Sequence, residues 1–374
     1  TAIDAYLEDY GYIKDSTSSV SMIDSGASAT FILDLSEGKH SIEFYALDSA
    51  TNREDTTIKA IFDRQNPDMC LSGLTEKFYN HQISGQLEAT DKYLQDWGYK
   101  IDTQDSVSFA DSGNVASFNL NPTEGTHQVN FFALDSATND TSIIKNLVVD
   151  KTLPDLTIEG FTGKYYNHAV SGKLQAADQY LQDWGYRLNG SETSFIDSGS
   201  VATFKVNPPE GEYEVEFFAL DSATNDTAIS KPLVMDRTDP AISLDGPSGK
   251  YYNHEISYEV SVGENHLKDY GYIINAGDSI SLIENGNVAS TSFDLEDGDH
   301  AISFYAKDSA KNKADTSFTA IFDRQKPKLE IGGLENGFYN QPTTVNIEVT
   351  EDHLKDYGYR MDDGNFVSLM EGGN

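Results

Sequence analysis

Residues Phe44–Asn52 read Phe-Tyr-Ala-Leu-Asp-Ser-Ala-Thr-Asn. An aromatic, apolar run that ends in a cluster of Asp, Ser and Asn is typical of a β-strand that enters a tight turn. Close copies of this string occur at Phe131–Asn139, Phe217–Asn225 and Phe304–Asn312. The chain is therefore built from repeats, and each repeat contains this strand and turn.

A second string gives the length of the repeat. Tyr-Leu-Glu-Asp-Tyr-Gly-Tyr at Tyr6–Tyr12 recurs with small changes, and its glycines are spaced 87, 87, 86 and 87 residues apart. A period near 87 residues is too long for a solenoid and suits one small domain. We place the repeats at residues 1–66, 67–153, 154–239, 240–326 and 327–374, and we expect the first and last to be incomplete.

The second repeat contains seven short runs rich in Val, Ile, Phe and Tyr, and none of its segments has helical periodicity. The runs cover residues 68–74, 82–89, 98–101, 107–109, 115–120, 127–134 and 142–149. Seven short strands in fewer than 90 residues predict an antiparallel two-sheet sandwich of immunoglobulin type. The fold class predicted for the whole chain is all-β, with tandem seven-stranded immunoglobulin-like sandwiches.

A corner before the sixth strand supports the sandwich. Glu210–Phe217 reads Glu-Gly-Glu-Tyr-Glu-Val-Glu-Phe, and Tyr213 would pack at the entry to that strand. His40, His127 and His300 stand at the same place in other repeats. We expect these histidines to bond to the backbone as corner residues and not to act in catalysis.

The joints between repeats are short and regular. Each consists of an Asp, a basic residue, two further residues and a Pro, at Asp63–Pro67, Asp150–Pro154, Asp236–Pro240 and Asp323–Pro327. Proline fixes its own φ and biases the preceding residue to extended forms. Joints this short, without a Gly/Ser-rich spacer, predict an elongated rod.

The chain is strongly acidic, with 61 Asp and Glu against 26 Lys and Arg and a net charge of −35. Such a surface repels nucleic acid and anionic lipid, so neither is an expected partner. No stretch of 18 apolar residues is present, so we expect no membrane insertion in this segment. Divalent cations are the natural complement of this charge; the alternative is that the acidity serves only solubility.

The topology of a sandwich brings acidic residues together at the joints. The B–C and F–G connections lie at the pole where the chain enters, so the joint Asp of one repeat should face these loops of the next. The expected sets are Asp63 with Asp91, Asp96, Asp135 and Asn139; Asp150 with Asp178, Asp183, Asp221 and Asn225; Asp236 with Glu264, Asp269, Asp308 and Asn312; and Asp323 with Glu351 and Asp356.

These sets suggest calcium. Converging carboxylates without a basic partner repel one another, and Ca²⁺, which takes 6–8 oxygen ligands, would relieve that repulsion. Oxygen-only ligation argues against zinc and copper, and His266 and His353 are only neighbours of the sets. The alternative is that Asp and Asn cap their own turns and the carboxylates are simply solvated. Both interpretations stay open at this point.

The remaining motifs do not indicate an enzyme. The sequence has no Gly-x-Ser-x-Gly elbow, no phosphate-binding glycine loop and no His-Glu-x-x-His. Cys70 is the only cysteine, which excludes a disulfide within the chain and a zinc site made of thiols, and we expect it to be a buried small hydrophobe. We expect Trp97 and Trp184 to pack at the ends of the sandwiches and not to form a sugar-stacking platform.

The repeat resembles the bacterial immunoglobulin-like (Big-type) domains of large cell-surface adhesins and extracellular filaments. The motifs that carry the resemblance are Gly-Lys-Tyr-Tyr-Asn at Gly249–Asn253, Phe-Tyr-Ala-Lys-Asp-Ser-Ala-Lys-Asn at Phe304–Asn312 and Ile-Phe-Asp-Arg-x-x-Pro at Ile321–Pro327. Those families commonly have Gly in the turn where Thr51, Thr138, Thr224 and Lys311 stand here. This departure puts a positive φ at that position in doubt.

The resemblance implies a non-enzymatic stalk or filament segment, extracellular and at the cell surface, whose partners are neighbouring repeats of the same chain. A calcium-stiffened joint would be similar to that of cadherins. One alternative is a self-assembling extracellular fibre or surface-layer subunit, whose partners are other copies of the chain. Another is a carbohydrate-binding module array of a secreted enzyme, which would expose Trp97 and Trp184.

Overall fold

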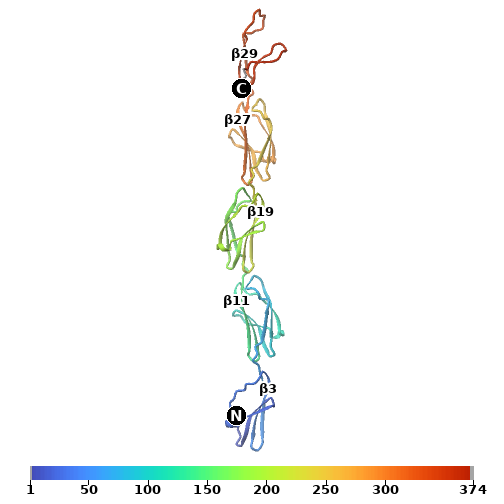
Figure 1. Ribbon diagram of the computed structural model, residues 1–374, viewed down its shortest axis with the longest axis vertical. Helices are drawn as coiled ribbons and strands as arrows, with labels where there is room; N and C mark the ends of the chain where they lie inside the picture. The colour runs from blue at the N-terminus through green and yellow to red at the C-terminus, as the bar shows by residue number, and fades with distance from the viewer. Residues whose placement is uncertain (1, 371–374) are drawn as a thin grey trace. The chain divides into compact units, whose positions relative to one another are not determined.

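The regular structure of this protein is almost entirely β-strand, as the computed structural model of residues 2–370 shows (Figure 1). The helical elements in these residues are the short 3₁₀ turns η1 (Ile23–Ser25), η2 (Ala110–Ser112), η3 (Ile196–Ser198) and η4 (Ile283–Asn285). Over the same range, no helix has the length and apolar character needed to span a membrane. The predicted all-β class is confirmed.

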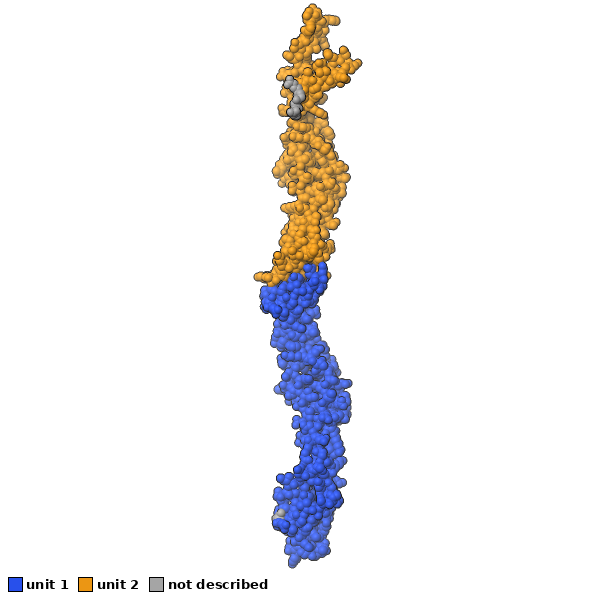
Figure 2. Space-filling model, viewed as in Figure 1, with its two compact units in different colours: residues 1–157, 174–202, 216–229 blue, residues 158–173, 203–215, 230–374 orange. Residues whose placement is uncertain are grey.

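The chain divides into two compact units, which Figure 2 colours separately. Unit 1 contains residues 1–157, 174–202 and 216–229, and unit 2 contains residues 158–173, 203–215 and 230–374. The division passes through the third repeat, so the first two repeats belong to unit 1 and the last two to unit 2. The repeat boundaries given above stay predictions.

In unit 1, the second repeat is a sandwich of two sheets. Its strands are β5 (Asp68–Ser72), β6 (Phe78–Tyr79), β7 (Ile83–Thr90), β8 (Leu94–Ile101), β9 (Val107–Ser108), β10 (Val115–Leu120), β11 (Gly125–Asp135) and β12 (Asp140–Val149). One sheet has the order β10-β7-β5 and the other β6-β12-β11-β8-β9. A single core cluster, which includes Leu87, Phe118 and Phe131, joins the two sheets.

Alternation along each strand produces this core. In β10, Ala116, Phe118 and Leu120 are buried while the residues between them are exposed, because successive side chains point to opposite faces. Each of the seven predicted runs overlaps one of these strands, and immunoglobulin-like sandwiches are confirmed as the fold. The structure adds β6, a two-residue strand that pairs in parallel with the end of β12.

The fourth repeat, in unit 2, has the same architecture. Its strands are β21 (Ala241–Asp245), β22 (Tyr251–Tyr252), β23 (Ile256–Gly263), β24 (Leu267–Ile274), β25 (Ser279–Ser281), β26 (Val288–Phe293), β27 (Gly298–Asp308) and β28 (Lys313–Phe322). The sheets have the orders β21-β23-β26 and β22-β28-β27-β24-β25. Their shared core contains Tyr258, Phe293 and Phe304.

The other strands follow the same succession. The first repeat has one sheet of order β2-β1-β3-β4, from β1 (Leu7–Lys14), β2 (Ser18–Ser21), β3 (Gly38–Asp48) and β4 (Arg53–Phe62). The third repeat has β13 (Asp155–Glu159), β14 (Tyr165–Tyr166), β15 (Val170–Ala177), β16 (Leu181–Leu188), β17 (Ser191–Ser194), β18 (Val201–Val206), β19 (Gly211–Asp221) and β20 (Asp226–Met235). The last has the pairs β29 (Lys328–Gly332) with β30 (Asn346–Thr350), and β31 (Gly358–Tyr359) with β32 (Val367–Ser368).

The corner residues and tryptophans lie as predicted. Nε2 of His40, His127 and His300 lies 2.7, 2.8 and 2.8 Å from a backbone carbonyl oxygen four residues upstream. Trp97 and Trp184 are 1% and 0% exposed. These tryptophans pack inside the repeats, which contradicts the exposure that a carbohydrate-binding array would require.

Two local expectations are wrong. Cys70 is exposed, because it lies on the outer face of edge strand β5 while Met69 and Leu71 pack against the core. The doubt about a positive φ in the turn is also unfounded, since Thr138 and Lys311 adopt φ of 73° and 78°. The turn keeps its left-handed residue without glycine.

Candidate metal centres at the repeat joints

The joint aspartates are placed by the short parallel strands. The backbone N–H of Asp150 donates to the carbonyl oxygen of Tyr79 at the end of β6, at 2.9 Å. The same bond links Asp236 to Tyr166 and Asp323 to Tyr252, also at 2.9 Å. At the second, third and fourth joints, the joint Asp is therefore held in register by its own repeat before the chain enters the next one.

The F–G turn supplies a second carboxylate. Asp135 is fully buried, and its Oδ1 accepts hydrogen bonds from the backbone N–H groups of Ala137 and Asn139, both at 2.8 Å. Its Oδ2 accepts from Asn139 Nδ2 at 2.6 Å, and the same amide donates to the carbonyl oxygen of Asp63 at 3.1 Å. Asp135 thus shapes the turn, and Asn139 ties the turn to the joint.

This pattern recurs at the next two joints. Asn225 Nδ2 donates to Asp221 Oδ2 at 2.7 Å and to the carbonyl oxygen of Asp150 at 2.9 Å. Asn312 Nδ2 donates to Asp308 Oδ2 at 2.6 Å and to the carbonyl oxygen of Asp236 at 2.9 Å. The amide nitrogens of the predicted ligands Asn139, Asn225 and Asn312 therefore have a structural task at each joint.

At the first two joints, three carboxylates converge. Each of Asp63, Asp91 and Asp135 offers an oxygen within 4.8 Å of those of the others, and Asp150, Asp178 and Asp221 do the same. Oδ2 of Asp63 is buried and has no hydrogen-bond partner among the described residues. Each of these two groups brings together three of the five residues of its expected set, all of them carboxylates, and their role as ligands stays a prediction.

Electrostatics differ within these groups. Burial tends to raise the pKa of Asp135, but the hydrogen bonds from Asn139, Ala137 and Thr138 together outweigh it and leave that pKa lowered. The pKa of Asp150 is raised, first by burial and then by the charges of Asp178 and Asp221. Asp150 therefore carries uncompensated repulsion, while Asp135 is stabilised as an anion by the turn.

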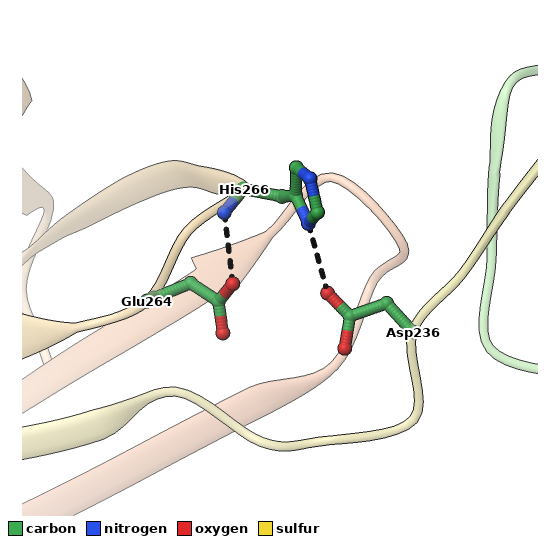
Figure 3. A group of neighbouring side chains, drawn as sticks. All are labelled: Asp236, Glu264 and His266. Atoms are coloured by element: carbon green, nitrogen blue, oxygen red, sulfur yellow. Dashed lines mark hydrogen bonds and ion pairs between the residues drawn. The ribbon is translucent and has the colours of Figure 1, made fainter. Parts of the chain in front are cut away.

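At the third joint, a histidine lies in the group where the first two joints have the F–G aspartate, and the fourth joint has a histidine at the same place, although the given sequence does not include the F–G turn of its last repeat. Asp236, Glu264 and His266 form one group, and Asp323, Glu351 and His353 form the other, again with ligand atoms within 4.8 Å of one another. Figure 3 shows the first of these groups, in which the His266 ring points toward Asp236. The expectation of oxygen-only ligands is wrong at these joints, because each histidine lies inside the group.

The contacts of His266 come from two repeats. Its Nδ1 lies 3.3 Å from Asp236 Oδ2 and its Nε2 lies 3.6 Å from Glu212 Oε1, and both carboxylates belong to the third repeat. Its backbone N–H donates to Glu264 Oε1 at 2.8 Å (Figure 3). His353 Nδ1 lies 3.5 Å from Asp323 Oδ2. The histidine therefore bridges the joint.

Several predicted ligands lie outside these groups. Asp96, Asp183, Asp269 and Asp356 each accept a hydrogen bond from a serine hydroxyl: Ser108, Ser194, Ser281 and Ser368, respectively. Asp308 holds its turn through Asn312 but is not among the three ligands of the third joint. These aspartates serve hairpins and turns in the structure.

Aromatic contacts accompany the second, third and fourth joints. The rings of Phe78 and Tyr180 lie 5.3 Å apart, those of Tyr165 and His266 lie 5.2 Å apart, and those of Tyr251 and His353 lie 5.1 Å apart, between centroids. The first member of each pair comes from the short parallel strand of one repeat, and the second comes from the B–C loop of the next. Tyr180, His266 and His353 therefore occupy equivalent positions, and each packs its ring against an aromatic residue of the preceding repeat.

The groups are open to solvent. Asp63 and Asp91 line one surface hollow, Asp150 and Asp178 line another, and His266 with its two carboxylates lines a third. An ion could therefore reach each of them from outside.

Comparison with known proteins gives only remote similarity. No family model matches the chain, and no curated protein matches it. Among solved structures, it is similar to a tetra-tandem repeat in the extending region of a large adhesion protein, with 15% identity over 87% of this chain and 93% of that one and a TM-score of 0.37. It is also similar to a 1.5-MDa bacterial ice-binding adhesin, with 11% identity, coverage of 70% and 98%, and a TM-score of 0.26. It is similar as well to fibronectin(III)-like modules of Clostridium thermocellum CbhA, with 14% identity over 45% of this chain and 94% of that one and a TM-score of 0.31.

Proposed function

We propose that this chain is a non-enzymatic structural segment of an extracellular surface protein. In this proposal, it is a stalk or filament of tandem immunoglobulin-like repeats, stiffened by short Pro joints and by Ca²⁺ at the first two of those joints. The observation that carries the proposal is the convergence of the joint Asp with two loop carboxylates of the following repeat, at both joints of unit 1.

The chemistry of these groups favours a hard cation. Three carboxylates with no basic residue in the group are a set that Ca²⁺ accepts, and backbone carbonyls or water can complete 6–8 ligands. The raised pKa of Asp150 and the unpartnered Oδ2 of Asp63 are both what an anionic group that needs a cation would display. The acidic composition and the resemblance to adhesin repeats support an extracellular location in this proposal, where Ca²⁺ would be available to the joints.

Binding would act on the joint. A bound ion would link the last strand of one repeat to two loops of the next and so limit bending between them. With affinities around 10⁻⁴–10⁻³ M and Ca²⁺ near 10 mM, each site would add roughly 1.4–2.7 kcal/mol of stability. That is a large share of the few kcal/mol expected for a domain of this size.

The test is calorimetric Ca²⁺ titration of the full chain, with thermal unfolding and small-angle scattering in calcium and in chelator. Calcium should raise the melting temperature and the radius of gyration, and Asp63→Asn and Asp150→Asn should each remove one bound ion. Asp96→Asn and Asp183→Asn are the matched controls, because these predicted ligands bond to serines and lie outside the groups. If calcium changes neither property, or if the controls lose calcium as the joint variants do, the proposal fails.

A further inference from the structure

The four joints differ in one coupled change of sequence. The B–C loop begins with Asp91 and Tyr93 in the second repeat and with Asp178 and Tyr180 in the third. In the fourth and fifth repeats, the corresponding pairs are Glu264 with His266 and Glu351 with His353. The longer carboxylate and the imidazole appear together or not at all.

The structure shows what the pair does. His266 and Glu264 both place a ligand atom beside the joint Asp236, and His353 and Glu351 do the same beside Asp323. The fully buried Asp308, whose counterparts Asp135 and Asp221 are ligands at the first two joints, is absent from the group. At the third joint, an imidazole nitrogen therefore lies where the first two joints have a carboxylate oxygen, and the fourth joint has the same set of Asp, Glu and His.

We propose that the third and fourth joints bind a borderline first-row divalent metal such as Zn²⁺ in preference to Ca²⁺. Imidazole nitrogen suits Zn²⁺ and its neighbours, whereas Ca²⁺ takes oxygen ligands almost exclusively. Two carboxylates and one imidazole leave room for solvent in the coordination sphere, and the surface hollow supplies access to it. The proposal rests on the proposed role of the joints as cation sites, and it divides them into two chemical classes.

Packing alone does not account for the histidine. The ring of His266 contacts Tyr165 at 5.2 Å, but Tyr180 makes the equivalent contact with Phe78 at 5.3 Å without any imidazole. Packing also gives no reason for Glu to replace Asp two residues earlier. The competing arrangement is an ion pair of a protonated His266 with Asp236 and Glu212, which would bind no metal.

The experiment is Zn²⁺ titration of the full chain by calorimetry in 10 mM Ca²⁺, a concentration on the order of ten times the weakest affinity expected for extracellular calcium sites. Two Zn²⁺ ions should bind per chain, and His266→Tyr and His353→Tyr should each remove one. Tyrosine is the residue of the first two joints, so these variants keep the aromatic contact. His254→Tyr is the control, because the hydrogen bond found for that exposed imidazole goes only to its neighbour Asn253. In spectra of the eight histidines, Zn²⁺ should shift the signals of His266 and His353 alone.

The converse variant rebuilds the site in unit 1. Asp178→Glu combined with Tyr180→His should give the second joint the mixed ligand set and a third Zn²⁺ per chain. The proposal is overturned if Zn²⁺ binding survives both single histidine variants, if the control loses as much, if Ca²⁺ displaces Zn²⁺ from these joints, or if the folded double variant gains none. Calcium loss in Asp150→Asn is measured separately, so a failure here leaves the calcium result of the first two joints standing.

Discussion

The first two joints and the last two solve the same geometrical problem with different ligands. In all four, the joint Asp meets the first carboxylate of the B–C loop. The third member of the group is the F–G aspartate, Asp135 or Asp221, at the first two joints and the B–C histidine His266 at the third; at the fourth it is His353, and the given sequence does not include the F–G turn there. The difference moves one ligand from one loop to another.

This difference separates two roles that coincide in unit 1. Asp221 both shapes its turn, through Asn225, and faces the carboxylate group. Asp308 makes the same bonds to Asn312 but does not belong to the group of Asp236, Glu264 and His266. The turn therefore requires its aspartate whether or not the joint uses that residue for an ion.

The largest expected effect comes from removing these two aspartates. Asp221→Ala and Asp308→Ala each delete a buried carboxylate that accepts from the N–H and Nδ2 of the following Asn. Each should cost about 3 kcal/mol, because hydrogen bonds to charged groups are strong and buried donors are left unpaired. Calorimetry should show the melting temperature of the affected repeat falling by more than about 10 °C.

Cation binding distinguishes the two variants. Asp221→Ala should lose one Ca²⁺, whereas Asp308→Ala should keep the metal of its joint when measured below the melting temperature. Equal loss of bound ions in both variants would show that the turn, and not the ligand set, controls binding.

A smaller effect is expected from Asp150, and its sign is opposite. The pKa of Asp150 is raised in the fold, so its charged form destabilises the repeat above that pKa, and the penalty disappears as the pH falls through it. Without metal at pH 7, Asp150→Asn should therefore melt a few degrees higher than the parent chain. The difference in melting temperature between Asp150→Asn and the parent chain should disappear as the pH approaches about 4.

Asp135 is the counterexample within unit 1. Its pKa is lowered, so its stabilising contribution is present above the unfolded pKa and is lost as the pH falls through the folded one. Asp135→Asn should melt lower than the parent chain at pH 7. A stabilised Asp135→Asn, or a destabilised Asp150→Asn in chelator, would contradict this assignment of roles.

Much of this arrangement is predictable from sequence, since alternate connections of an antiparallel sandwich share a pole. That rule places Asp63 beside Asp91 and Asp135 without any structure. It fails for Asp96 because β8 begins at Leu94, four residues before the predicted strand, so Asp96 belongs to a strand and not to the B–C loop. An irregular register beside it, between Leu134 and Asp135, hides this start from pattern analysis.

Other features leave too little signal in the sequence. A two-residue strand such as β6 cannot show alternation, although it fixes the register of Asp150. The oxygen-only pattern of the first two joints does not extend to the groups that contain His266 and His353. The signal that could have found them is the joint change of Asp and Tyr to Glu and His at Glu264 and His266.

The aromatic contacts offer a finer comparison of the joints. A double-mutant cycle on Phe78→Ala and Tyr180→Ala should give a coupling of about 0.5–1.5 kcal/mol between the second and third repeats. The same cycle on Tyr165→Ala and His266→Ala should give a similar value in chelator and a larger one in Zn²⁺, because the metal would fix the imidazole. A coupling energy that Zn²⁺ leaves unchanged would show that His266 contributes only its ring contact with Tyr165 and binds no metal.

The smallest expected effect lies in the F–G turn, where unit 1 has Thr138 and unit 2 has Lys311. Both adopt a left-handed backbone, at φ 73° and 78°, which strains any residue with a Cβ by roughly 1–2 kcal/mol. Glycine removes this strain but gains freedom in the unfolded chain, which offsets about 0.5–1 kcal/mol of the benefit. Thr138→Gly should therefore stabilise its repeat by up to about 1 kcal/mol, and Lys311→Gly by less, since only threonine is β-branched. Thermal unfolding of both variants in chelator measures which glycine variant stabilises its repeat more. If both variants are destabilised instead, the side chains of Thr138 and Lys311 stabilise the turn by more than the backbone strain costs.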